Sequence, residues 1–169
     1  MTAETTLIIL GASGDLTSRL LLPALGQLLA REPQRRVKLH GAGTDDWSDD
    51  TWRDTVRASF RTTDADAAFA CLSSTTYTRA DITRPEALQS ILDAAEGRPA
   101  LYFAVPPGVA AAACEALEHV QLPADTILAL EKPFGSDADG AARLDEVLAG
   151  IVPEDQIFRI DHFLGRSTV

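Results

Sequence analysis

Short apolar runs that alternate with amphipathic stretches restrict how this chain can fold more than any other feature of its sequence. The runs of strand length are Thr6–Leu10, Arg36–Gly43, Thr75–Asp81, Ala100–Val105, Thr126–Glu131 and Asp155–Asp161. The stretches between them predict helices at Leu16–Leu29, Asp49–Phe60, Asp64–Leu72, Pro85–Ala95, Val109–Leu117 and Ser136–Leu148, the last with Ser136 as its N-cap. Strands that alternate with helices form a parallel sheet. We therefore expect an α/β fold, a doubly wound and mostly parallel sheet with helices on both faces.

Length and composition indicate one domain and exclude some classes of partner. The 169 residues are 46% hydrophobic, which is enough for a single core, so we expect one domain over residues 1–169. A formal charge of -10, from 15 Lys and Arg against 25 Asp and Glu, argues against nucleic acid or an anionic membrane as partner. The sequence shows neither a signal peptide nor a membrane-spanning run, and we expect a cytoplasmic protein.

The cysteines and two of the histidines give no sign of a metal site. Cys71 and Cys114 lie among apolar or small residues and lack the spacing of zinc ligands. We expect both to be reduced thiols in the core, with no disulfide and no bound metal. His40 and His119 fit no ligand pattern, and we expect them to be structural or exposed.

A glycine turn follows the first predicted strand, where ligands of such sheets bind. The stretch "GASGDL", Gly11–Leu16, lies between a strand and an amphipathic helix. Glycine lets the backbone approach a pyrophosphate, and the helix N-terminus favours the anion. The spacing is Gly-x-x-Gly, which also occurs in tight turns that serve packing alone. From spacing alone, dinucleotide binding and simple packing remain equally open.

Three motifs together resemble one enzyme family. "GASGDL", "EKPFG" at Glu131–Gly135 and "DQIFRIDHFLG" at Asp155–Gly165 occur in the order and approximate spacing of the N-terminal coenzyme domain of glucose-6-phosphate dehydrogenases. The resemblance covers essentially the whole chain. It implies a Rossmann-like domain that serves hydride transfer from glucose 6-phosphate to NADP or NAD, giving 6-phosphogluconolactone. It also implies a homo-oligomeric full-length parent, whose C-terminal substrate and dimerisation domain this chain lacks.

By that resemblance, the loops after the first, second and fourth predicted strands hold the coenzyme together with Lys132. The expected coenzyme-binding residues are Gly11, Ala12, Ser13, Gly14, Asp15, Leu16, Thr44, Asp45, Ala104, Val105, Pro106 and Lys132. NADP-type members carry a lysine and an arginine where this chain has Leu20 and Thr44. The following Asp45 and Asp46 would repel a 2′-phosphate and accept ribose hydroxyls, so the residues lean towards NAD. The alternatives are a cation from Arg19, or a solvated loop at Asp45–Asp46.

The same resemblance assigns the chemistry to the two later motifs. It implies that Lys132 binds the sugar and aligns it with the nicotinamide, and that Asp161 orients a general-base histidine of the absent domain. His162 and Arg166 would bind the sugar phosphate. Phe163 and Arg166 replace a tyrosine and a lysine of the family pattern, which changes the geometry of phosphate binding. Without the resemblance, Lys132 reads as a surface charge and Asp161–His162 as a capped turn.

Alternatives to an oxidoreductase remain at this stage. A non-catalytic dinucleotide-binding or regulatory module fits the short length and the altered phosphate positions. Another reductase or epimerase would need a Tyr-x-x-x-Lys pair, which neither Tyr77 nor Tyr102 provides. We expect a fragment, a split gene product or a stand-alone coenzyme domain, which would bind dinucleotide weakly and show no turnover alone.

Overall fold

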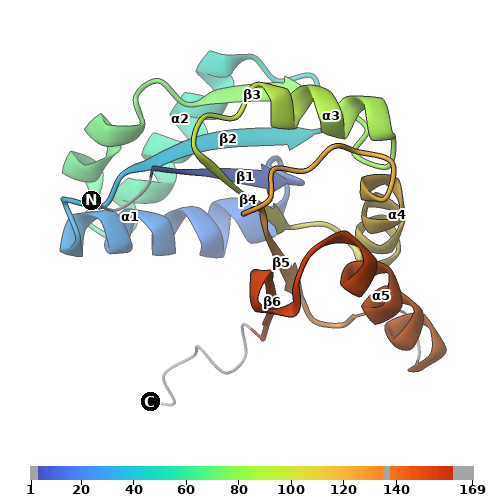
Figure 1. Cartoon of the computed structure of the whole chain (residues 1–169). Helices are drawn as coiled ribbons and strands as arrows, with labels where there is room; N and C mark the ends of the chain where they lie inside the picture. The colour runs from blue at the N-terminus through green and yellow to red at the C-terminus, as the bar shows by residue number, and fades with distance from the viewer. Residues whose placement is uncertain (1–3, 135–137, 162–169) are drawn as a thin grey trace.

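The computed structural model describes residues 4–134 and 138–161, which form a sheet with flanking helices (Figure 1). The strands are β1 (Thr5–Leu10), β2 (Val37–Gly43), β3 (Thr76–Arg79), β4 (Arg98–Phe103), β5 (Ile127–Glu131) and β6 (Ile157–Ile160). The helices are α1 (Leu22–Arg31), α2 (Asp49–Arg61), α3 (Pro85–Asp93), α4 (Pro107–Leu117) and α5 (Ala138–Ile151). Short π- or 3₁₀-helical segments are η1 (Thr17–Leu21), η2 (Asp66–Leu72) and η3 (Glu154–Gln156).

The sheet has the strand order of a dinucleotide-binding fold. The order is β3-β2-β1-β4-β5-β6, and the described pairs are parallel. This order reverses beside β1, which pairs with β2 on one side and β4 on the other. Ligands of such sheets bind at the carboxyl ends of the strands, next to the reversal. The prediction of a Rossmann-like α/β fold is confirmed.

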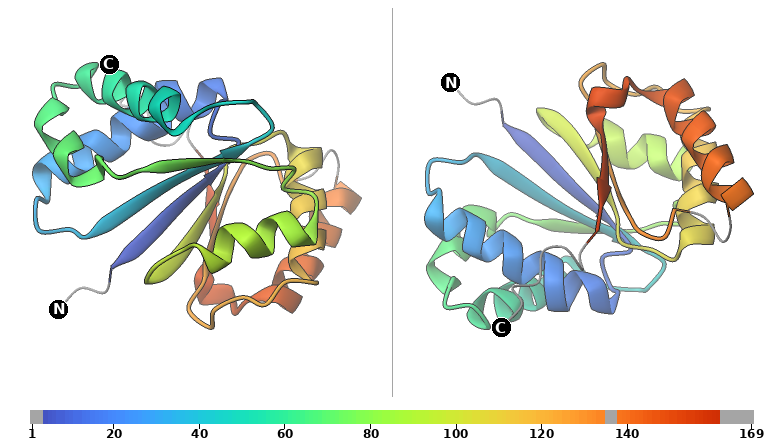
Figure 2. Two further views of the ribbon diagram at one scale, coloured as in Figure 1. Left: turned by 90° about the horizontal axis from the view of Figure 1, so that it is seen from above. Right: turned by 90° about the horizontal axis from the view of Figure 1, so that it is seen from below.

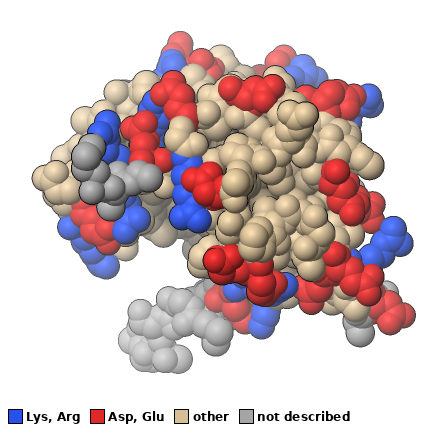
Figure 3. All heavy atoms as spheres, viewed as in Figure 1, with Lys and Arg blue, Asp and Glu red and all other residues tan. Residues whose placement is uncertain are grey.

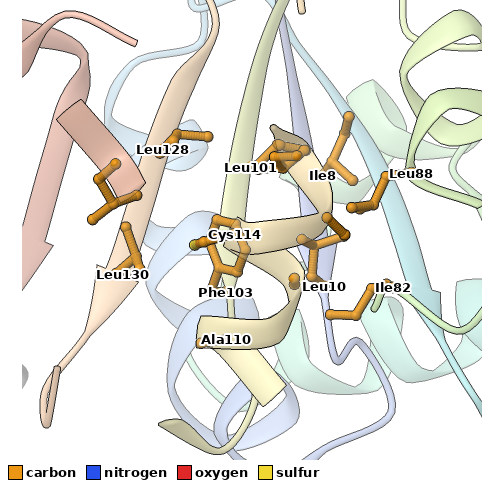
Figure 4. Close-up of a cluster of buried hydrophobic side chains, with 14 of the residues drawn as sticks. Ile8, Leu10, Ile82, Leu88, Leu101, Phe103, Ala110, Cys114, Leu128 and Leu130 are labelled. Carbon is orange, nitrogen blue, oxygen red and sulfur yellow. The ribbon is translucent and has the colours of Figure 1, made fainter. Parts of the chain in front are cut away.

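Two hydrophobic cores lie on opposite faces of the sheet. One core packs α3, α4 and α5 against the sheet, with Leu101, Phe103 and Cys114 among its buried residues (Figure 4). The other packs α1, α2 and η2 against β1–β3 and is centred on Trp52 and Phe60. Both views of Figure 2 show α1 and α2 on one side of the sheet and α3, α4 and α5 on the other. The predicted helices on both faces are therefore present.

Some elements differ from the sequence prediction. The first helix begins with the π-helical turn η1, and the helix expected at Asp64–Leu72 is the 3₁₀ segment η2. Ser136, the expected N-cap of α5, lies outside the described residues. The prediction of two core thiols is wrong for Cys71, which is exposed in η2. Cys114 is buried in α4, and burial raises the pKa of its thiol to about 12.

Among residues 4–134 and 138–161, the helices are too short or too polar to cross a lipid bilayer. The same residues bring together no cluster of His, Cys, Asp and Glu that could hold a metal ion. His40 is partly buried on β2 and His119 is exposed after α4.

Candidate functional site

The glycine turn after β1 is held tightly against the end of β4. Gly11 has a φ of +89°, and a Cβ there would lie 2.3 Å from the carbonyl oxygen of Ala104. The amide nitrogens of Gly11 and Ala12 donate to the Ala42 oxygen at 2.8 and 3.0 Å, which ties the turn to β2. Only glycine fits this backbone conformation at so short a distance. The first glycine of "GASGDL" is therefore required by the fold, as the packing interpretation of the motif allows.

The end of β2 places a carboxylate beside the same turn. The Ser13 hydroxyl donates to the Asp45 carboxylate, and the Tyr77 hydroxyl donates to the Asp45 carbonyl oxygen at 3.1 Å. Burial raises the pKa of Tyr77, so its hydroxyl stays a donor at neutral pH. Asp46 instead pairs with Arg79 at 3.4 Å, both side chains being largely exposed. Of the two consecutive aspartates, Asp45 is thus the one fixed at the glycine turn.

A cavity of about 270 Å³ opens at this point on the carboxyl edge of the sheet. Residues expected to bind coenzyme that line it are Gly11, Ser13, Gly14, Thr44, Ala104, Val105 and Pro106. Of the others, Ala12 is buried under the turn, Leu16 packs on the core of α1 and α2, and Asp15 pairs with Arg19 at 3.8 Å. The structure therefore gathers the predicted coenzyme loops after β1, β2 and β4 around one cavity, whereas Asp45 and Lys132 do not line it.

The cavity also includes residues that the sequence analysis did not select. These are Gly43, Ala80, Asp81, Ile82 and Val109. Asp81 accepts bonds from the Thr83 amide and hydroxyl at 3.0 and 2.7 Å, and these bonds lower its pKa. The signal that could have found Asp81 is its place just after a strand, where polar residues of the other loops were sought.

The second motif meets the third across β5 and β6. The Lys132 amide donates to the Ile160 oxygen at 3.0 Å, which extends the pairing of the two strands. The Lys132 ammonium lies 3.2 Å from the Asp161 carboxylate, with side-chain exposures of 54% and 21%. The Lys132–Pro133 peptide bond is cis. The two residues predicted to be catalytic, 29 positions apart in the sequence, therefore form an ion pair at the ligand edge.

A hydrogen bond between Tyr102 and Glu131 lies next to this ion pair in the sequence, because Glu131 precedes Lys132. The Tyr102 hydroxyl on β4 donates to the Glu131 carboxylate, which immediately precedes Lys132. Burial and the neighbouring carboxylate raise the pKa of Tyr102 above its usual value, so the phenol remains protonated. From the sequence, Tyr102 is assessed only as a catalytic tyrosine. Its bond to Glu131 cannot be predicted there, because the bond depends on the pairing of β4 with β5.

The two phosphate candidates, His162 and Arg166, lie outside the described residues. The glycine turn on β1 and the ion pair on β5 and β6 are separated by β4. Neighbouring strands lie about 4.8 Å apart, so β1 and β5 are about 10 Å apart. One ligand of dinucleotide length could therefore contact both groups.

Comparisons with known sequences agree with this arrangement. Residues 8–169 match the family model described as glucose-6-phosphate dehydrogenase, NAD binding domain. Glucose-6-phosphate 1-dehydrogenase 1 of Mycobacterium tuberculosis is 33% identical over 172 residues, which cover 99% of this chain and 37% of that protein. Glucose-6-phosphate 1-dehydrogenase of Dickeya dadantii is 31% identical over 175 residues, which cover 96% of this chain and 35% of that protein.

Solved structures give the same result. The crystal structure of glucose-6-phosphate 1-dehydrogenase from Mycobacterium avium has a TM-score of 0.83 and 31% identity, covering 98% of this chain and 37% of its own. A glucose-6-phosphate dehydrogenase in complex with its substrate glucose-6-phosphate has a TM-score of 0.78 and 28% identity, covering 99% of this chain and 39% of its own. Sequence and fold thus agree over almost the whole chain, and it belongs to the glucose-6-phosphate dehydrogenase family, where it corresponds to the NAD-binding domain.

Proposed function

We propose that this chain is the coenzyme-binding part of an enzyme that transfers hydride from glucose 6-phosphate to a nicotinamide dinucleotide, preferably NAD. The product would be 6-phosphogluconolactone. The observation that carries the proposal is the arrangement of the glycine turn, the Asp45 carboxylate and the Lys132–Asp161 ion pair along one edge of the sheet. The chain spans little more than a third of the length of these relatives. We expect no turnover of substrate by this chain alone.

The coenzyme half of the proposal rests on the cavity at β1. Its glycines leave the backbone accessible to a diphosphate, and the Gly14 oxygen accepts from the Ser18 amide at 3.3 Å, so the turn leads into the N-terminus of the helical segment, which favours an anion. The Asp45 carboxylate, fixed by Ser13, would accept bonds from ribose hydroxyls and repel a 2′-phosphate. The residues that line the cavity therefore fit a dinucleotide, and those after β2 favour NAD.

The chemical half rests on the β5–β6 edge. When bound, the nicotinamide accepts hydride from the sugar, while the hydroxyl proton goes to a base. Lys132 would donate a hydrogen bond to the sugar and fix its position, because its ammonium is held at a defined point by Asp161. Asp161 would orient the base histidine, and His162 and Arg166 would bind the sugar phosphate.

Titration of the chain with NAD and NADP tests the coenzyme assignment. We expect tighter binding of NAD, and a loss of about fivefold to tenfold in NAD affinity for Asp45→Asn, because a charge-assisted bond to ribose is lost. Asp46→Asn is the matched control, since Asp46 pairs with Arg79 and should leave affinity nearly unchanged. Tighter binding of NADP by the unmodified chain would contradict the preference.

A chimera tests the chemical assignment. The chain would replace the matched stretch of the Mycobacterium tuberculosis relative, and coenzyme reduction would be followed at 340 nm, the usual absorbance for reduced nicotinamide. We expect activity with glucose 6-phosphate and a loss of about a hundredfold or more in kcat/KM for Lys132→Ala. Lys38 is the other lysine of the sequence and pairs with Glu96, so Lys38→Ala is the matched control. Equal activity of the two variants would refute the role of Lys132.

The non-catalytic module remains the second candidate, because Phe163 and Arg166 depart from the family pattern at the positions expected to bind the sugar phosphate. The same chimera separates the two functions. Tight dinucleotide binding by the chain together with an inactive, folded chimera would favour the module.

A further inference from the structure

A diphosphate at the glycine turn has to be held against the charge of the rest of the chain. The net charge is -10, and carboxylates are spread over the face shown in Figure 3. Asp15 of the turn lies 3.8 Å from Arg19, with side-chain exposures of 85% and 77%, and so exposed a pair contributes little to anion binding. The backbone of the turn therefore has to present amides, and not carbonyl oxygens, to the anion.

The peptide unit between Gly11 and Ala12 is held by three hydrogen bonds. Its N–H, which belongs to Ala12, donates to the Ala42 oxygen at 3.0 Å. Its carbonyl oxygen, which belongs to Gly11, accepts from the Gly14 amide at 3.1 Å and from the Thr17 hydroxyl at 3.2 Å. Thr17 is 0% exposed, so this oxygen is directed towards the protein interior. The first amides of the helical segment, which lack acceptors within a helix, are left to face an anion.

The π-helical turn η1 places the Thr17 hydroxyl at the glycine turn and Leu22 in the core at the same time. The Leu22 amide donates to the Thr17 oxygen, five residues earlier. Both residues are 0% exposed. In an α-helix, residues five positions apart point about 140° from each other, which exceeds an apolar stripe of roughly 100°. A π-helical turn, with its bond between residues i and i+5, brings both onto one face.

Packing alone does not require the buried hydroxyl of Thr17. Valine has the same branched shape, and burial of a hydroxyl costs free energy unless the group is hydrogen-bonded. The acceptor of the Thr17 hydroxyl is the carbonyl oxygen of Gly11, the first residue of the glycine turn. The next hydroxyl along the chain, that of Ser18, donates instead to the Asp15 oxygen at 3.4 Å. Thr17 is thus the side chain of η1 that connects the helix to the peptide unit at Gly11.

We propose that Thr17 is a positioning residue of the coenzyme cavity, a role that rests on the proposed function. Its hydroxyl acts through the Gly11 carbonyl: it holds that oxygen towards the helical segment, and its dipole offsets part of the negative charge of the oxygen. The glycine turn then presents amides to the diphosphate. The ligand chemistry for which Thr17 selects is therefore a phosphate chain, and not the adenosine or the nicotinamide at its ends.

Titrations with NAD, inorganic pyrophosphate and adenosine separate this role from a structural one. They are run at one ionic strength and followed through the NMR amide shifts of Gly11 and Gly14. We expect Thr17→Val to weaken NAD and pyrophosphate binding about threefold to tenfold and to leave adenosine binding unchanged, because only a phosphate chain meets the freed carbonyl. Thr17→Ala lacks the same hydroxyl and should behave alike, whereas Thr17→Ser keeps it and should bind within about twofold of the unmodified chain. Thr55→Val is the matched control, because the Thr55 hydroxyl bonds a carbonyl oxygen of α2, that of Thr51, at 2.9 Å.

The pattern across the three ligands decides the role of Thr17. Circular dichroism and thermal melts verify that each variant is folded. Equal pyrophosphate affinity of the unmodified chain and the variants without the hydroxyl overturns the role, and so does an equal loss for all three ligands, which would show a distorted cavity. If the unmodified chain binds pyrophosphate and not NAD, the coenzyme assignment is wrong, and pyrophosphate still decides the role of Thr17. An unmodified chain that binds none of the three overturns both.

Discussion

The two halves of the sheet differ in how completely they are covered. In β1, consecutive residues Ile8 and Ile9 are both buried, one in each core. In β5, Leu128 and Leu130 are buried, whereas the intervening Ala129 retains exposure. In "TILALE" the residues Ile127, Ala129 and Glu131 alternate with the buried leucines and keep partial exposure. Within the described residues, β5 is therefore covered on one face and β1 on both.

This difference divides the proposed function between the halves. The coenzyme cavity lies where the two halves meet, between the turn after β1 and the end of β4, and its supporting strand β1 is covered on both faces. The Lys132–Asp161 pair lies at the half that the described helices cover on one face. Under the proposed function, dinucleotide binding would depend on the strands around β1 and hydride transfer on the ends of β5 and β6.

The largest expected effect comes from a comparison of two phenylalanines on opposite faces of β4–β6, the strands that the described helices cover on one face. Phe103 on β4 is 1% exposed and Phe158 on β6 is 51% exposed. Phe103→Ala should lower the free energy of unfolding by about 3 to 5 kcal/mol, because it leaves a cavity under α4. Phe158→Ala should lower it by less than about 1 kcal/mol. Urea denaturation measures both, and similar losses would mean that Phe158 is covered in the isolated chain.

A smaller effect is expected at the boundary between the halves. Gly11→Ala places a Cβ 2.3 Å from the Ala104 oxygen at a positive φ, so we expect a loss of about 2 to 3 kcal/mol in stability. Dinucleotide binding should be lost with it, because the cavity loses its shape. Gly108→Ala is the control: it lies in α4 with open space around it and should be neutral or stabilising. A stable, binding-competent Gly11→Ala would refute the close approach of β1 and β4.

More of the fold than of the site could be predicted from the sequence. The strand runs and the glycine turn are local signals, so α/β alternation and the loops around Gly11 and Ala104 could be predicted. The Ser13–Asp45 and Tyr102–Glu131 bonds join separate strands and depend on register, which no local pattern specifies. Cys71 was placed wrongly because a short apolar stretch does not distinguish an α-helix from the 3₁₀ segment that exposes it.

The smallest expected effect is a pH dependence of the free energy of unfolding that comes from His40 on β2. His40 on β2 lies on the α3 side, with its Nδ1 2.9 Å from the Thr76 hydroxyl oxygen. Burial lowers its pKa below the ordinary 6.5, and the Asp49 carboxylate opposes this weakly. The unfolded chain then binds the proton first as the pH falls below 6.5, so the His40 contribution to stability is complete above 6.5 and is lost progressively below it.

His40→Gln should remove this dependence. We expect the free energy of unfolding to fall less between pH 7.5 and pH 5.5 in the variant than in the unmodified chain, since glutamine does not titrate there. Urea denaturation at the two pH values measures the difference. His119→Gln is the matched control, because His119 is exposed and should follow the unmodified chain. If His40→Gln also follows the unmodified chain, the α3 side of β2 admits water, and the contrast between the two halves of the sheet is weaker than the burial of β1 indicates.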